Sequence, residues 1–281
     1  MTTALVLCGG GSLGAIQVGM LQALVEFGLA PDLIVGVSAG ALNGAFLAAG
    51  ADAATTQRMA GLWRRARTRE ILGLSWRSAL GLAGLRDHIG DSRGLRALLE
   101  RELGGLLIEQ LAIPLYVVCA DFATGEAVVL ARGSLVEATL ASSAIPGVFA
   151  AVRIDGRDLV DGAIASETPI AVAARLGASR VIVLPCGFAC VGTAVPRHAL
   201  GRAMHAVTLL GARQLRLDYE RHAAQLELRI VPPLCPLNQS ASDYSQGAAL
   251  IDRALAATRA WLDSGGLDQA VFPGGLQEHR H

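Results

Sequence analysis

A serine at the end of a short apolar run stands in a spacing that would make it a nucleophile. Residues 33–37 are apolar and mostly β-branched, and small, helix-tolerant residues follow Ser38 as far as Gly50. This pattern predicts a strand, a sharp turn and a helix, with the serine at the turn. Gly36-Val37-Ser38-Ala39-Gly40 has the spacing of a nucleophile elbow, whose small residues let strand and helix backbones approach. The helix N-terminus would place partial positive charge near Ser38 Oγ. A serine that only caps the helix is the alternative.

A glycine-rich turn near the N-terminus could bind an anion through its backbone. Residues 4–7 predict a buried strand, and the run 9–14 (GGGSLG) precedes a helix expected over residues 15–27. Two interpretations are open. One is an oxyanion hole, whose N–H groups would meet Ser38 because the carboxyl ends of parallel strands share one edge. The other is a dinucleotide-binding fingerprint with Asp32 as its acid, although Asp32 precedes a strand instead of ending one.

An aspartate follows a predicted hairpin in the second half of the chain. Residues 152–160 predict two short strands joined at Asp155-Gly156, a favoured hairpin turn. The second strand leads into Asp161-Gly162-Ala163. Because two apolar residues precede Asp161, we expect it in a partly desolvated turn. An ordinary turn-forming Asp-Gly pair is the alternative.

The composition excludes several other kinds of chemistry. The 281 residues are 52% hydrophobic and 17% charged, with 33 glycines, which favours a buried parallel sheet covered by helices. The formal net charge is zero, so no nucleic-acid partner is expected. All 24 basic residues are arginine, which rules out a Walker-type phosphate loop, a Schiff base and a Ser–Lys dyad. The five cysteines favour reduced thiols in a cytoplasmic protein, and we expect no metal ion and no cofactor.

The remaining sequence alternates predicted strands and helices. We expect strands at residues 113–120, 126–130, 180–185 and 226–231, and helices at residues 95–103, 135–143, 198–222 and 246–262. Residues 52–110 differ in composition from the rest of the chain, because Trp63 and a basic run (64–69) precede an apolar stretch that contains Trp76. Two interpretations are open: a cap that makes peripheral contact with a membrane, or a solvated helical excursion. Residues 33–51 are apolar enough for a membrane span, but the elbow within them favours a buried strand and helix.

Three pieces of the sequence, taken in order, resemble the patatin-like phospholipase family. They are the glycine turn, the elbow and Asp161-Gly162-Ala163, and the stretches 141–149 and 155–157 also look like that family. The similarity covers roughly residues 4–185. The resemblance implies a three-layer α/β/α sandwich with a mostly parallel central sheet. It also implies a lipid acyl hydrolase that works with a Ser–Asp dyad on a lipid or other acyl ester.

The resemblance assigns a role to each site residue. Ser38 would be the nucleophile and Asp161 its base, so that attack gives an acyl-enzyme which water then hydrolyses. The oxyanion hole would be formed by Gly9, Gly10 and Gly11, with further motif glycines at Gly14, Gly36, Gly40 and Gly162. Leu13 stands where the family often has Arg or Lys, which leaves neutral esters open as substrates. Ala150-Ala151 replaces the family's proline pair.

We expect one catalytic domain over residues 1–264, with residues 52–110 as a helical cap, and a weakly ordered tail at 265–281. The oligomeric state is not predicted. Two other functions remain open. One is an α/β-hydrolase esterase with a Ser–Asp–His triad, whose base would be His198, His205 or His222. The other is a non-catalytic protein that binds lipids or acyl chains.

Overall fold

The computed structural model describes residues 1–73, 78, 88–165, 167–187 and 199–269. Within these residues an eight-stranded sheet runs in the order β5-β6-β3-β2-β1-β7-β8, with β4 also paired to β3. Strands β3, β2, β1, β7 and β8 are parallel, whereas β4, β5 and β6 pair antiparallel. The strands are β1 (Thr3–Leu7), β2 (Leu33–Val37), β3 (Leu115–Asp121), β4 (Ala127–Leu130), β5 (Val152–Ile154), β6 (Arg157–Asp161), β7 (Arg180–Leu184) and β8 (Glu227–Ile230).

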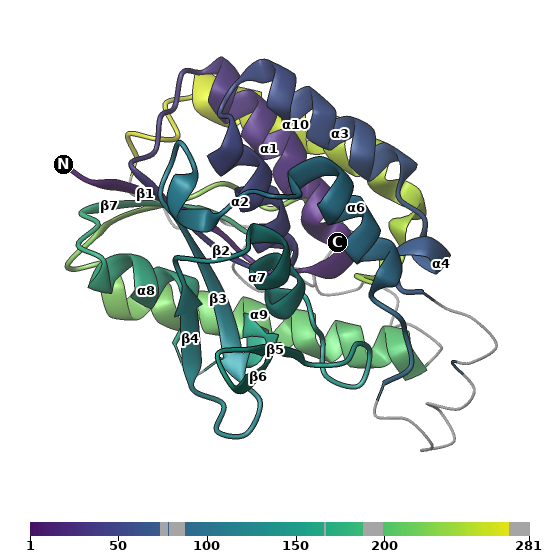
Figure 1. Ribbon diagram of the computed structural model, residues 1–281. Coiled ribbons are helices and arrows are strands. Elements are labelled where there is room, and N and C mark those ends of the chain that lie inside the picture. The colour runs from purple at the N-terminus through teal and green to yellow at the C-terminus, as the bar shows by residue number, and fades with distance from the viewer. Residues whose placement is uncertain (74–77, 79–87, 166, 188–198, 270–281) are drawn as a thin grey trace.

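Helices cover both faces of the sheet (Figure 1). Side chains alternate along each strand, so Leu5 and Leu7 join one core while Ala4 and Val6 join another. The first core includes residues of α1 (Gly14–Glu26), α2 (Ala39–Ala49), α3 (Ala53–Arg65), α6 (Arg93–Leu103), α7 (Leu135–Ser142) and α10 (Gly247–Asp263). The second includes residues of α8 (Pro169–Arg175) and α9 (Ala199–His222). The predicted three-layer α/β/α architecture is confirmed.

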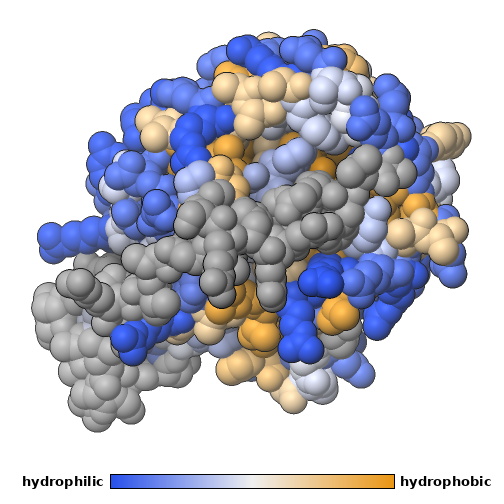
Figure 2. Space-filling model, turned by 180° about the vertical axis from the view of Figure 1, so that it is seen from behind, coloured by the Kyte–Doolittle hydropathy of each residue, from blue (hydrophilic) through white to orange (hydrophobic). Residues whose placement is uncertain are grey.

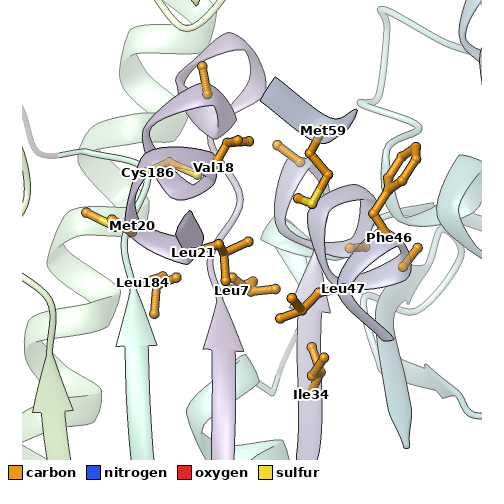
Figure 3. Close-up of a cluster of buried hydrophobic side chains, with 14 of the residues drawn as sticks. Leu7, Val18, Met20, Leu21, Ile34, Phe46, Leu47, Met59, Leu184 and Cys186 are labelled. Carbon is orange, nitrogen blue, oxygen red and sulfur yellow. The ribbon is translucent and has the colours of Figure 1, made fainter. Parts of the chain in front are cut away.

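The first core is built from aliphatic and sulfur-containing side chains with little aromatic content. Leu7 and Ile34 of the sheet lie beneath Leu21 of α1 and Leu47 of α2, and Met59 of α3 lies farther out (Figure 3). Each of these five side chains is buried. Such packing fixes α1 and α2 on the strands that precede them, and therefore fixes the two turns that join strand to helix.

The pairing of β3 brings the end of β6 next to the end of β2. On one edge of β3, Val118 pairs with Val37 of β2, and the next residue, Cys119, pairs with Asp161 of β6. The opposite edge of β3 is taken by β4 over this whole stretch. Strands β2 and β6 therefore follow one another along the same edge, and the residue after Val37, Ser38, comes to lie beside Asp161.

Most of the predicted elements are present, including the hairpin at Asp155-Gly156, where both residues have positive φ. Residues 33–51 form β2 and α2, and no helix among the described residues has the length and hydropathy to cross a membrane. The single domain over residues 1–264 and its cap stay predictions. Residues 74–77 and 79–87 of the cap, His198, and residues 270–281 of the tail lie outside the described residues.

The prediction of reduced thiols is confirmed for three cysteines and wrong for one. Cys8, Cys119 and Cys186 are free, and all three lie on or directly after a strand of the sheet. Cys235 is disulfide-bonded. It lies half-buried in the loop after β8, outside the strands of the sheet. Cys190 lies outside the described residues.

Candidate active site

Ser38 occupies a strained turn between β2 and α2. Its φ of 55° and ψ of −125° lie outside the ordinary regions for an L-residue, as expected at a nucleophile elbow. Its side chain makes no cap hydrogen bond to α2, so the interpretation of a serine that only caps the helix is wrong. Its backbone N–H donates to Ser142 Oγ at 2.8 Å, and that hydroxyl donates to Val118 O at 2.6 Å. The turn is thereby tied to α7 and β3.

Three of the predicted motif glycines are required because backbone segments approach each other at this turn. A Cβ at Gly40 would lie 2.1 Å from Leu7 O, and one at Gly36 would lie 2.7 Å from Gly40 O. A Cβ at Gly162 would lie 2.3 Å from Val118 O. Each position would force backbone apart if it carried a side chain, which explains the small residues around Ser38.

The structure brings the two predicted reactive side chains together. Ser38 Oγ donates a hydrogen bond of 2.6 Å to Asp161 Oδ2, and Ala163 N donates one of 2.9 Å to Asp161 Oδ1. Asp161 is 3% exposed and Ser38 6%. Burial raises the pKa of Asp161 to about 6, although the hydrogen bonds from Ser38 and Ala163 oppose that rise. Asp161 is therefore a stronger base than an ordinary carboxylate, and it is ionised above about pH 6.

Replacing Asp161 with asparagine is expected to stabilise the fold at neutral pH. The amide keeps the shape, accepts the Ala163 N–H and donates to Ser38 Oγ, but it carries no buried charge. Since the folded carboxyl has a pKa of about 6 against an ordinary 3.8, wild-type stability falls as pH rises from about 4 to 6. At about 1.4 kcal/mol per pKa unit, the cost reaches on the order of 3 kcal/mol. Thermal melts of both proteins at about pH 4 and pH 8 measure it, and a variant less stable than wild type at pH 8 would contradict it.

The glycine turn lies against Ser38. A Cβ at Gly9 would lie 3.2 Å from Ser38 Cβ, and Gly11, with φ of +56°, lines the same pocket as Ser38. A Cβ at Gly10 would lie 2.2 Å from Cys186 Cβ. The N–H groups of Gly9, Gly10 and Gly11 donate to no acceptor in the described part of the chain. The turn thus has donors available beside the serine.

The dinucleotide interpretation of this turn does not fit the structure. Asp32 lies at the start of β2, where its Oδ2 accepts the Thr3 N–H at 2.7 Å. The acid of a dinucleotide fingerprint stands at the opposite, carboxyl end of the second strand. The first turn of α1 also packs against α2 and α3, because a Cβ at Gly14 would lie 2.8 Å from Ala39 Cβ and from Trp63.

A buried polar network that the sequence analysis missed holds the turn from behind. Gln17 Nε2 donates to Cys8 O and to Leu184 O, each at 2.8 Å, and so links the ends of β1 and β7. Asn43 Nδ2 donates to Gly14 O and to Gln17 Oε1, each at 2.9 Å. Trp63 Nε1 completes the network by donating to Asn43 Oδ1 at 2.9 Å. Gln17 and Asn43 are polar residues inside the mostly apolar helices α1 and α2, and this was the signal that the sequence offered.

The cysteines beside the turn do not compete with Ser38 as nucleophiles. Cys186 Sγ donates to Cys8 O at 3.1 Å. Burial raises the pKa of Cys8 to about 12 and raises that of Cys186 well above its ordinary value. Both thiols are neutral at physiological pH and therefore unreactive.

An apolar pocket opens from Ser38. None of the described residues that line it is charged, and most are apolar. Such a lining suits a lipid acyl chain or another small apolar ligand. Its wall includes Phe149 and residues of four helices, namely Leu42 and Phe46 of α2, Met59 of α3, Leu98 of α6 and Met204 of α9.

Trp63 belongs to this pocket, which corrects one interpretation of the cap. Trp63 is 7% exposed and stacks on Tyr244 with ring centroids 6.1 Å apart. It is therefore not a surface residue that anchors the chain in a membrane. Trp76, the other aromatic of that prediction, lies outside the described residues. No group of three or more metal-ligating side chains occurs among the residues that the structure describes.

The histidines proposed for a triad do not meet the serine where the structure describes them. Neither His205 nor His222, both on α9, hydrogen-bonds to Ser38 or Asp161. His222 Nε2 is buried and has no hydrogen-bond partner among the described residues. The hydrogen-bond acceptor in contact with Ser38 Oγ is the carboxylate of Asp161.

Comparisons with known proteins place the chain in a family. A family model described as Patatin-like phospholipase matches residues 5–174. Neuropathy target esterase sws of Drosophila melanogaster is 30% identical over 185 residues, which cover 65% of this chain and 13% of that protein. An uncharacterized NTE family protein of Mycobacterium tuberculosis is 34% identical over 181 residues, which cover 64% of this chain and 48% of that protein. The chain thus spans less than half the length of these curated relatives.

Among solved structures, VipD from Legionella pneumophila is similar to this chain with a TM-score of 0.47 and 16% sequence identity. That match covers 94% of this chain and 67% of the VipD chain.

Proposed function

Because the chain belongs to the patatin-like phospholipase family, we propose that it is a serine lipid acyl hydrolase that cleaves carboxylic esters through an acyl-enzyme on Ser38. The observation that carries this proposal is the hydrogen bond of 2.6 Å between Ser38 Oγ and Asp161 Oδ2 at the start of an apolar pocket. A nucleophile in direct contact with its base is the arrangement that such chemistry requires.

The proposed reaction has two half-reactions. In the first, Ser38 Oγ attacks the ester carbonyl carbon while Asp161 Oδ2 takes the hydroxyl proton. The negative charge that develops on the carbonyl oxygen is stabilised by N–H donors of Gly9, Gly10 and Gly11. The ester C–O bond then breaks, and the alcohol leaves with the proton from Asp161. In the second half-reaction, water loses a proton to Asp161, attacks the acyl-enzyme and releases the carboxylic acid from Ser38.

The oxyanion donors must supply much of the rate. A carboxylate is a weak base for a serine hydroxyl, even with its pKa raised to about 6 by burial. One oxyanion donor is typically worth about 10²–10³ in rate. The glycine turn offers more than one N–H beside Ser38 and keeps them at the N-terminal side of η1 (Gly11–Leu13) and α1. This arrangement compensates for the weak base.

We further propose that the pocket binds the acyl chain and leaves the alcohol part of the ester outside. The described lining carries no charge that could pair with a phosphate. Leu13, at the position where the family often has a basic residue, is buried. Recognition would then come from the hydrocarbon chain, and neutral esters would be substrates alongside any phospholipid.

A panel of p-nitrophenyl esters of increasing chain length tests this function. We expect kcat/KM to rise by about fourfold per added methylene as long as the chain lies within the pocket, because a buried CH₂ is worth about 0.8 kcal/mol. The Ser38→Ala variant gives the background for every ester. A protein that binds the long-chain esters but turns over none of them would instead be a lipid-binding protein.

A further inference from the structure

Helix α9 has an unusual distribution of charge and exposed apolar surface. Between Ala199 and Leu217 it contains three arginines and no acidic residue, although the whole chain has a formal net charge of zero. Four large apolar side chains of this stretch are exposed. They are Val207, Leu209, Leu210 and Leu217. Leu210 is the most exposed of them, with 67% of its surface accessible to solvent.

The exposed apolar residues and the arginines form two parallel strips on the outer side of the helix. At about 100° per residue, Ala203, Val207, Leu210 and Leu217 fall on one strip. Arg202, Arg213 and Arg216 fall on the neighbouring strip, with Leu209 among them. All of these residues are exposed. The buried side of α9 carries Met204, which lines the pocket, and Leu215, which joins the core beneath the sheet.

The outer surface on the α9 side of the molecule carries both hydrophobic and hydrophilic groups. Helix α9 lies behind the sheet in Figure 1, so it belongs to the side that Figure 2 shows, where hydrophobic groups gather among hydrophilic ones in the lower part of the view. An exposed apolar strip beside a basic strip is typical of helices that lie in the interface of a membrane.

We propose that this outer side of α9 docks on an anionic lipid surface, with Leu210 and Leu217 inserted and Arg213 against the headgroups. The proposal rests on the proposed function only for its purpose, since docking would hold the enzyme at the surface that supplies the ester. A second copy of the chain is a poorer occupant. A symmetric contact through α9 would bring two basic strips into one interface, and like charges there disfavour association.

This surface differs from the membrane contact considered for residues 52–110. Trp63 is buried in the pocket, and Arg64 is paired with Asp252 of α10 at 2.5 Å. On α9 itself, Arg216 is paired with Glu220 at 3.2 Å. Arg213 has no ion pair with an acidic residue in the part of the chain that the structure describes, so it is the arginine that faces the lipid headgroups.

Sedimentation with lipid vesicles tests the proposal without relying on catalysis. The Ser38→Ala chain is used, so that binding is measured in the absence of turnover. It is mixed with phosphatidylcholine vesicles with or without phosphatidylglycerol. Three further changes are compared in that background: the pair Leu210→Ser and Leu217→Ser, Arg213→Gln alone, and Phe27→Ser. Phe27 is the matched control, because it is 56% exposed at the end of α1 on the other side of the sheet.

We expect binding that depends on phosphatidylglycerol. The double serine variant should bind at least tenfold more weakly, and Arg213→Gln about fivefold more weakly, since one basic residue near such a surface contributes on the order of that factor. Phe27→Ser should bind as the parent does. Equal binding by all four proteins, an equal loss in Phe27→Ser, or no binding by the parent would overturn the proposal. A dimer that the double serine change dissociates, with vesicle binding intact, would assign the face to a second copy.

A parallel assay separates this proposal from the proposed function. In the otherwise unchanged chain, the double serine variant should hydrolyse a soluble short-chain ester at the parent rate and lose hydrolysis of vesicle-bound esters. A chain that binds vesicles through α9 but hydrolyses neither ester would contradict the enzymatic proposal and leave the docking surface standing.

Discussion

Replacing Ser38 with alanine is expected to lower kcat/KM for ester hydrolysis by about three orders of magnitude or more. The change removes the only atom that would form the acyl-enzyme and leaves the elbow itself in place, since alanine fits the space of the serine. Because the change also removes the hydrogen bond to the buried Asp161 carboxylate, stability should fall by about 1–3 kcal/mol. The measurement is the initial rate with a p-nitrophenyl ester, together with a thermal melt.

A purely structural role for Ser38 predicts a different result. If Ser38 only holds the backbone of the turn, the alanine variant keeps most of its activity as long as it folds. A well-folded Ser38→Ala protein with more than about a tenth of the wild-type rate would therefore contradict the role of this residue.

Replacing Asp161 with asparagine is expected to cost several orders of magnitude in kcat/KM, although the same change stabilises the fold. The amide cannot accept the proton that Ser38 Oγ loses on attack. Because burial raises the pKa of Asp161 to about 6, the wild-type rate should increase as pH rises through about 6 and then level off. The variant should have no such step. Steady-state rates from about pH 4.5 to 8.5 measure both effects.

Histidine variants provide the control for the base. With a Ser–Asp dyad, changing His198, His205 or His222 to alanine one at a time should leave kcat/KM within about tenfold, below roughly 1.4 kcal/mol. In a triad, removal of the base costs as much as removal of the nucleophile, because the groups act as a unit. A folded histidine variant as inactive as Ser38→Ala would overturn the dyad.

The sequence predicts the elbow well because its signals are local. The strand, Ser38 and the helix follow one another within 17 residues from Leu33 to Ala49, and the close approaches that require Gly36 and Gly40 fall inside the motif or on the adjacent strand. The same holds for the hairpin before Asp161, whose turn residues have the expected positive φ. Local patterns of this kind determine local structure.

The contact between Ser38 and Asp161 is different, because the two residues are 123 positions apart. No periodicity in the sequence brings them together; the pairing of both β2 and β6 along one edge of β3 does. The family resemblance supplied that link before the structure did. The role of Ser142, which accepts the Ser38 N–H, could not be predicted for the same reason.

Trp63 shows why two interpretations of residues 52–110 stayed open. An aromatic residue beside a run of arginines is compatible with a membrane surface, but Thr56, Met59, Ala60 and Trp63 repeat with helical spacing and are all buried. That periodicity was the better signal. The exposure of the apolar strip of α9 could not be predicted from the sequence, because it depends on which side of the helix packs against the sheet.

Intact-mass spectrometry after treatment with a fluorophosphonate tests the central claim most directly, because the reagent reports an activated serine whatever the natural ester is. The wild-type chain should gain the mass of one phosphonyl group, located on the peptide that contains Ser38. Asp161→Asn should label far more slowly, and Ser38→Ala should not label at all. Labelling of the Ser38→Ala chain to the same extent as the wild type would show that the nucleophile is another residue.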